Sequence, residues 1–190
     1  MKVIAFNGSP RKKGNTYHAI QTVLKELRKE GIETELIQLG GTDIRACRAC
    51  FTCFEKKNKR CIQKDNLNSY IDKMIGAEGI IIGSPTYFSN VSPEVKALID
   101  RAGLVARANN HLFKRKVGAA VVAVRRAGAT HVYSSINFFF GIGHMIIPGS
   151  SYWNLGIGRN PGDILKDKEG MATFRDLGKN MAWLLKKLYK

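Results

Sequence analysis

Four cysteines in one short segment are the residues of this chain best suited to chemistry. Cys47, Cys50 and Cys53 are three residues apart, and Cys61 follows after a gap of seven residues. Four thiolates that converge on one small object ligate an iron-sulfur cluster. A structural zinc ion more often takes its cysteines as two separated pairs. The spacing therefore favours a cluster over zinc, and free or redox-switching thiols are the third interpretation.

Basic residues surround these cysteines. Glu55 is the single acidic residue between Arg45 and Lys64, and it is outnumbered by Arg48, Lys56, Lys57, Lys59 and Arg60. This excess would offset the negative charge of a thiolate-bound cluster, although a solvated basic loop also accounts for residues 56–60 taken alone. The whole chain has 31 Lys and Arg against 15 Asp and Glu, a net charge of +16. Such a field attracts an anionic cofactor, an acidic protein partner or nucleic acid.

A second candidate for chemistry is the segment from Gly8 to Thr16, which reads GSPRKKGNT. It lies between a predicted strand and a predicted helix, where backbone amides and the positive end of the helix point at an anion. It lacks the ending of a Walker loop and the glycine spacing of the dinucleotide fingerprint. A surface turn is the plainer interpretation, but the position after the first strand favours a phosphate site.

A polar and aromatic loop from Ser84 to Asn90 follows the predicted buried strand 79–82. Ligands of open α/β sheets bind at the carboxyl edge where such loops emerge. The first loop can hold a phosphate while Tyr87 and Phe88 lie against a flat ring. Alternatively, these two aromatic residues cap the hydrophobic core.

The elements that must position these loops follow from the spacing of the apolar residues. Alternating strands and helices predict a parallel, doubly wound α/β sheet. We expect one domain, residues 1–190, with a cysteine-rich insertion at about 44–64. The predicted strands are 3–6, 34–39, 79–82, 117–124 and 145–147, and the predicted helices are 16–27, 65–75, 92–104, 129–143 and 171–188. Residues 149–170 read as a long irregular segment, which in a compact domain is more often functional than slack.

The apolar stretches also bear on location. The run after Met1 is too brief for a signal peptide, and stretches 117–124 and 136–147 are shorter than the roughly 20 residues of a membrane span. The sequence thus predicts a cytoplasmic protein without membrane association. A reducing compartment argues against pairing the four cysteines as disulfides.

The chain resembles the flavodoxin-like NAD(P)H-dependent FMN reductases, whose first loop reads Gly-Ser-Pro-Arg followed shortly by Gly-Asn-Thr. This resemblance implies a flavodoxin-like, five-stranded parallel sheet of order 2-1-3-4-5 with helices on both faces, and FMN as cofactor. It implies that Ser9, Arg11, Asn15 and Thr16 hold the FMN phosphate. It further implies that the isoalloxazine ring is held by Pro85, Thr86, Tyr87 and Phe88.

The cysteine segment is similar to that of the iron-sulfur flavoproteins of anaerobic prokaryotes. In that group a compact C-x2-C-x2-C, with a fourth cysteine downstream, binds a four-iron cluster. The similarity implies a 4Fe-4S cluster on Cys47, Cys50, Cys53 and Cys61. It also implies a homo-oligomer, either a dimer or a tetramer.

The predicted function is FMN-dependent electron transfer, with electrons accepted from ferredoxin or another acidic donor that suits the charge of +16. No residue is assigned a catalytic role. Arg125 and Arg126 follow the fourth strand where simple reductases have a glycine-rich loop, which argues against direct use of NAD(P)H. Arg125 or Arg126 could meet the flavin or an acidic partner. Tyr152, Trp153 and Arg159 could cover the flavin, and an oligomer interface is an equal alternative for Tyr152 and Trp153.

Two other functions stay open. One is a cluster-free NAD(P)H-dependent FMN, quinone or nitro reductase. The other is a basic nucleic-acid-binding module with a zinc loop. The latter explains neither of the paired loops that begin near Ser9 and Ser84.

Overall fold

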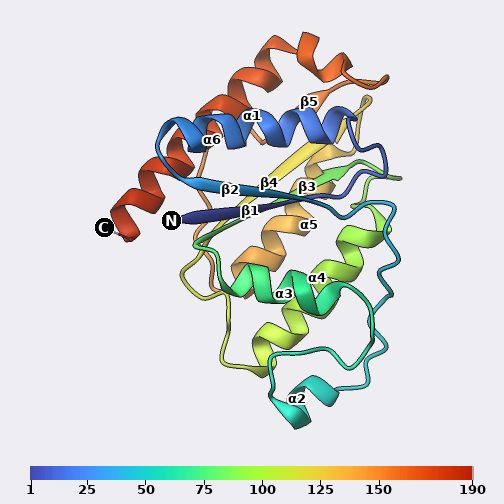
Figure 1. Ribbon diagram of the computed structural model, residues 1–190. Helices are drawn as coiled ribbons and strands as arrows, with labels where there is room; N and C mark the ends of the chain where they lie inside the picture. Colours follow the sequence, from blue (N-terminus) through green and yellow to red (C-terminus); the bar gives the residue numbers. More distant parts are fainter. Residues whose placement is uncertain (190) are drawn as a thin grey trace.

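A computed structural model describes residues 1–189 of the chain (Figure 1). Five strands and the helices between them follow the predicted alternation closely. The strands are β1 (Lys2–Asn7), β2 (Glu33–Gln38), β3 (Gly79–Pro85), β4 (Val117–Val124) and β5 (Leu155–Ile157). The α-helices are α1 (Asn15–Lys29), α2 (Thr52–Lys56), α3 (Leu67–Ile75), α4 (Pro93–Ala108), α5 (Ala129–Ile142) and α6 (Lys168–Leu188), and η1 (Asp163–Lys166) is a short 3₁₀ helix.

The strands form one parallel sheet in the order β2-β1-β3-β4-β5, which confirms the predicted flavodoxin-like order. The register brings the ends of neighbouring strands level. Asn7, the last residue of β1, lies opposite Gln38 of β2 and Gly83 of β3. The loops that leave these strands therefore share one edge of the sheet.

Helices cover both faces of the sheet, as Figure 1 shows. On one face α1 and α6 pack together over the side chains of Val3, Ala5 and Ile81. On the other face α3, α4 and α5 pack over Ile4 and Phe6. Each fully buried Ile or Leu in these layers stabilises the fold by about 1.5–3 kcal/mol. No helix in residues 1–189 is both long and apolar enough to cross a bilayer.

The predicted fifth strand at 145–147 is wrong. Ile146 makes only an isolated parallel bridge to Val117 at the start of β4. Pro148 has no N–H with which to continue such pairing, so the apolar run ends there. The true fifth strand, Leu155–Ile157, pairs with the other end of β4, from Val122 to Val124. Residues that follow β5 consequently reach the edge where the predicted loops emerge.

Two candidate functional sites

A pocket of about 180 Å³ lies at the carboxyl edge of the sheet, and we call it the sheet-edge pocket. Seven of the eight residues expected to hold FMN line it, and they come from the loop after β1, the start of α1, the end of β3 and the loop after it. The lining residues are Ser9, Arg11, Asn15, Thr16, Pro85, Thr86, Tyr87, Ala123, Val124, Arg125, Gly158 and Arg159. Loops that follow β1, β3, β4 and β5 thus converge on a single pocket.

The loop between β1 and α1 presents backbone and hydroxyl donors to this pocket. Ser9 is buried, and its Oγ accepts a hydrogen bond of 3.2 Å from the N–H of Arg11. Helix α1 starts after Gly14, and no side chain caps its first N–H groups. The first N–H groups of a helix have no acceptor within the helix, so they can bind an anion.

Close packing fixes this first loop. A Cβ on Gly8 would lie 2.3 Å from the side chain of Val95, and a Cβ on Gly40 would lie 2.3 Å from the carbonyl carbon of Ser9. The side-chain amide of Gln38 donates hydrogen bonds of 2.7 Å to the carbonyl oxygens of Ser9 and Gly40. The loop is therefore held from both sides before any ligand binds.

The loop after β3 forms a tight hairpin turn. Tyr87 and Asn90 exchange two backbone hydrogen bonds of 2.9 Å, and Phe88 and Ser89 between them have positive φ angles of 47° and 60°. Such a turn places its two central residues at the tip. Tyr87 lines the pocket, whereas Phe88 is fully exposed and lies outside it. The structure thus does not bring Phe88 to the residues with which it was grouped.

Three arginines line the sheet-edge pocket, namely Arg11, Arg125 and Arg159. Among residues 1–189, no acidic side chain lines it. A pocket with this balance favours a dianion such as a phosphate monoester. Arg126 does not line it, and Tyr152 and Trp153 line a different cavity of about 360 Å³.

Gly158 is a lining residue that the sequence analysis missed. A Cβ there would lie 2.6 Å from the backbone nitrogen of Ile164 and 2.8 Å from the side-chain Nδ2 of Asn15. Only glycine therefore fits beside Asn15 without displacing it. The misplaced fifth strand hid this residue, because Gly158 directly follows the true β5.

The second candidate site is a pocket lined by all four cysteines, and we call it the cysteine pocket. None of the four forms a disulfide. The pocket shares no lining residue with the sheet-edge pocket. Figure 1 shows the segment that carries it leaving β2 and passing through α2, outside the layer of α3 and α4. The remaining lining residues are Arg48, Phe51, Ile62, Gln63, Arg101, Leu104 and Val105.

The cysteine pocket has the donor set of a four-iron cluster, for which four thiolates are the usual ligands. Among residues 1–189, no three Cys, His, Asp or Glu side chains are grouped closely enough to hold a metal ion. A tetrahedral zinc ion needs all its ligands within about 2.3 Å of one point, whereas the thiolates of a cluster bind different iron atoms. The structure therefore places the four cysteines around one small pocket of about 20 Å³ and shows no single-ion site among residues 1–189.

The local backbone and environment differ among the cysteines. Ala49 and Phe51, on either side of Cys50, both have positive φ angles, of 50° and 53°. Cys50 is exposed. The pKa of its thiol is lowered mainly by a hydrogen bond from the backbone N–H of Thr52 and, to a smaller extent, by one from the Thr52 hydroxyl. Burial raises the pKa of the Cys53 thiol. Cys50 is thus the more readily ionised of the two.

Arg101 is the second residue that the sequence analysis missed. It lines the cysteine pocket from α4 and is itself buried. The signal was present, because Arg101 follows Leu98 by three residues and precedes Val105 by four on the apolar face of the helix. A cation within an apolar stripe needs a partner in the folded chain.

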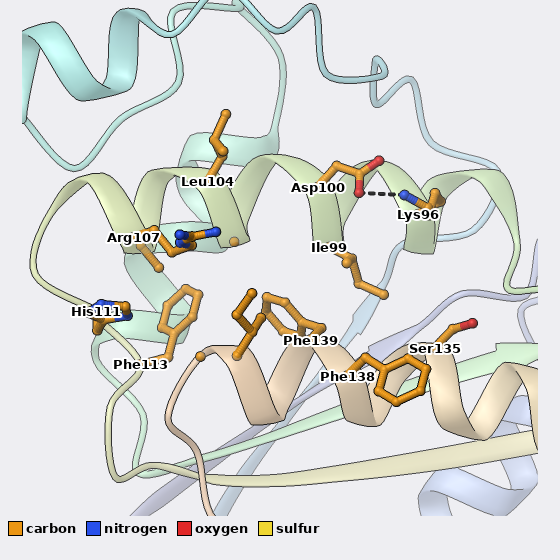
Figure 2. Close-up of a pocket in the computed structure, with 14 residues that line it drawn as sticks. Lys96, Ile99, Asp100, Leu104, Arg107, His111, Phe113, Ser135, Phe138 and Phe139 are labelled. Atoms are coloured by element: carbon orange, nitrogen blue, oxygen red, sulfur yellow. Dashed lines mark hydrogen bonds and ion pairs between the residues drawn. The ribbon is translucent and has the colours of Figure 1, made fainter.

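A larger cavity, of about 450 Å³, lies between α4 and α5 (Figure 2). Its wall is mainly apolar and includes the rings of Phe113, Phe138 and Phe139. Lys96 and Asp100, which form an ion pair of 2.5 Å, lie on the α4 side. None of the predicted site residues lines this cavity, so its size does not mark it as the site of their chemistry.

The sequence matches a known family model and several curated proteins. Residues 1–160 match the model of the NADPH-dependent FMN reductase family. The chain is 39% identical over 197 residues to an iron-sulfur flavoprotein of Methanocaldococcus jannaschii, with 100% of both chains covered. It is 33% identical over 192 residues to an iron-sulfur flavoprotein of Methanosarcina thermophila, with 100% of this chain and 98% of that protein covered.

Solved structures with the same fold are more distant in sequence. RosB superposes with a TM-score of 0.76 at 19% identity, over 99% of this chain and 80% of the other. A WrbA-like flavodoxin of Agrobacterium tumefaciens superposes with a TM-score of 0.62 at 12% identity, over 98% and 96% of the two chains. These likenesses support the flavodoxin-like fold.

Proposed function

The chain belongs to the NADPH-dependent FMN reductase family and, within it, to the iron-sulfur flavoproteins, and from this premise we propose that it transfers electrons through FMN and a 4Fe-4S cluster. The FMN occupies the sheet-edge pocket, and Cys47, Cys50, Cys53 and Cys61 hold the cluster. The proposal rests above all on the seven expected FMN residues that line one pocket without an acidic side chain in residues 1–189.

The phosphate of FMN binds at the start of α1. There Ser9 and Thr16 offer hydroxyl groups, Asn15 an amide and Arg11 a guanidinium, next to N–H groups that no side chain caps. A hydrogen bond between charged groups contributes about 1.5–3 kcal/mol. The isoalloxazine ring lies against Pro85, Thr86 and Tyr87, which line the same pocket.

A cluster on the four cysteines would supply single electrons, and FMN can hold one or two. The residues of this chain contribute the thiolates and a basic environment. Arg48 and Arg101 line the cysteine pocket, and among residues 1–189 no acidic side chain lines it. Such an environment balances the negative charge of a thiolate-bound cluster.

The electron donor we propose is ferredoxin or another acidic protein, since the net charge is +16. Complementary fields accelerate the encounter of two proteins and are screened by salt. We also propose that the protein forms a dimer or tetramer, which light scattering at several protein concentrations would test.

Anaerobic rapid mixing with two donors tests this function. With reduced ferredoxin we expect the flavin to be reduced, and the second-order rate constant to fall about tenfold or more between low and high salt. With NADPH we expect reduction to be much slower. Fast reduction by NADPH, unchanged in a variant in which all four cysteines are serine, would instead identify a cluster-free reductase.

A further inference from the structure

Arg101 is the most deeply buried cation of the described chain, with 1% of its surface exposed. Burying a guanidinium is costly unless each of its N–H groups finds a partner. Its partners therefore indicate what this side chain does in the folded protein.

Asp65 is the first partner. Nη1 of Arg101 lies 2.5 Å from Oδ2 of Asp65, and Nη2 lies 3.0 Å from Oδ1. This two-bond pairing is the geometry that guanidinium and carboxylate prefer. Burial alone would lower the pKa of Arg101, but the hydrogen bonds to Asp65 and Cys61 outweigh it and raise that pKa.

The sulfur of Cys61 is the second partner. Nε and Nη2 of Arg101 donate hydrogen bonds of 3.4 and 3.3 Å to this Sγ. Asn68 fixes the backbone of the same cysteine with two hydrogen bonds, one from the N–H of Cys61 at 2.8 Å and one to its carbonyl at 2.9 Å. Both the position and the orientation of Cys61 are thus set before a ligand binds.

Arg101 also closes the ends of the cysteine segment. Its Nη1 donates a 2.9 Å hydrogen bond to the carbonyl of Arg45, and the N–H of Arg45 donates to Asp65 at 3.1 Å. Gln63 adds a parallel tie, a hydrogen bond of 2.9 Å to the carbonyl of Ala46. The segment therefore has a second closure that does not depend on Arg101.

Closure alone does not explain a buried arginine, because apolar residues often replace buried ion pairs without loss of stability. The feature that only a guanidinium provides is a fork of N–H groups that serves Asp65 and the Cys61 sulfur together. We propose that Arg101 is a positioning residue that orients Cys61 as the fourth cluster ligand and raises the reduction potential of the bound cluster.

The physical reason is charge. Reduction adds one negative charge to a cluster, and hydrogen bonds to ligand sulfur stabilise that charge and raise the potential. This inference rests on the proposed function, because it requires a cluster on the four cysteines.

Two variants and one control test the inference. Arg101→Lys keeps the charge but removes the fork. The double variant Arg101→Gln with Asp65→Asn keeps the net charge and leaves no carboxylate buried without a partner. The control, Arg60→Gln, removes a positive charge from the same segment, but its side chain pairs with Asp72 at 3.0 Å, half exposed.

The readouts are iron per chain, FMN per chain and the cluster potential from an anaerobic titration followed by electron paramagnetic resonance. We expect both Arg101 variants to keep FMN and either to lose the cluster or to hold it at a more negative potential. The cluster potential should fall by at least about 59 mV, which for a one-electron couple equals a tenfold change in the equilibrium constant for reduction. The control should keep its iron and move the potential less.

Three results would overturn the inference in distinguishable ways. If both variants hold four irons at the potential of the control, Arg101 does not tune the cluster and the proposed function stands. If both variants lose FMN together with iron, Arg101 acts only through the fold. If the unmodified protein binds FMN but no iron, the proposed cluster itself fails before any variant is made.

Discussion

The sheet-edge pocket and the cysteine pocket hold their residues by different means. The sheet-edge pocket is built from loops at the ends of β1, β3, β4 and β5. Its phosphate loop packs closely against its neighbours because Gly8 and Gly40 have no side chain. The cysteine pocket belongs to a segment between β2 and α3 that is closed by Arg101, Asp65 and Gln63. The sheet-edge pocket thus depends on the packing of the sheet and its loops, whereas the cysteine pocket depends on a few side-chain hydrogen bonds.

This difference implies that the two sites can be broken separately. Loss of the cysteine pocket should leave the sheet and its edge intact, because the two pockets share no lining residue. A change at the sheet edge should leave the iron content unchanged.

We expect the largest effect from Cys53→Ser. Cys53 is the buried cysteine of the four, and a hydroxyl is a poor substitute for a thiolate on iron. Iron per chain should fall from about four to below about one, while FMN per chain stays the same. Colorimetric iron analysis and flavin absorbance measure both, and a variant that loses FMN together with iron would contradict the independence of the two sites.

Arg11→Ala should have the next largest effect. Loss of a charged hydrogen bond to phosphate costs about 1.5–3 kcal/mol, so the Kd for FMN should rise by about 10- to 150-fold. Riboflavin, which lacks the phosphate, serves as the control ligand, and its Kd should not change. Equal weakening for FMN and riboflavin in fluorescence titrations would show that Arg11 does not contact the phosphate.

A smaller effect is expected from Tyr87→Ala, for which Phe88→Ala is the matched control. An aromatic contact contributes about 0.5–1.5 kcal/mol, so the Tyr87 variant should bind FMN about 2- to 12-fold more weakly. Phe88 is fully exposed outside the pocket, and its removal should leave the affinity unchanged. The opposite order of effects would mean that the turn rearranges when FMN binds.

The smallest expected effect is the pH dependence of the stability that Asp65 contributes to the fold. Burial would raise the pKa of this carboxyl, but hydrogen bonds from Arg101 and from the backbone N–H groups of Arg45 and Leu67 hold it below the usual 3.8. Such a group contributes its full stability above that pH, and the contribution is lost as the pH falls through the folded value. The advantage of the unmodified protein over Asp65→Asn in urea unfolding should shrink below about pH 3.8; an advantage that grew there would contradict this assignment.

The sequence predicted much of the fold because its apolar runs and turn residues agree with one another. The β4 run 117–124 was predicted to the residue, and the loops at Ser9 and Ser84 emerged where the sheet order requires. The prediction of the fifth strand was wrong because β5 has only three residues with no strong pattern, whereas the segment 145–147 is apolar. Phe88 lies outside the pocket because its place depends on the backbone of a turn, which residue types alone do not determine.

The cysteine pocket was predictable in composition but not in construction. The spacing identified the four thiols, whereas the contacts of Arg101 to Asp65 and Cys61 join residues 36 and 40 positions apart. Such contacts depend on how α4 packs beside the segment. The sequence pattern alone shows only a charged residue on the apolar face of this helix.

The most direct test of the whole account is the composition of the protein purified without oxygen. We predict one FMN with about four iron and four sulfide ions per chain, together with flavin bands over broad cluster absorption. FMN without iron, even after reconstitution with iron and sulfide, would contradict the cluster and leave a flavin reductase. A protein without flavin would contradict the sheet-edge pocket as well.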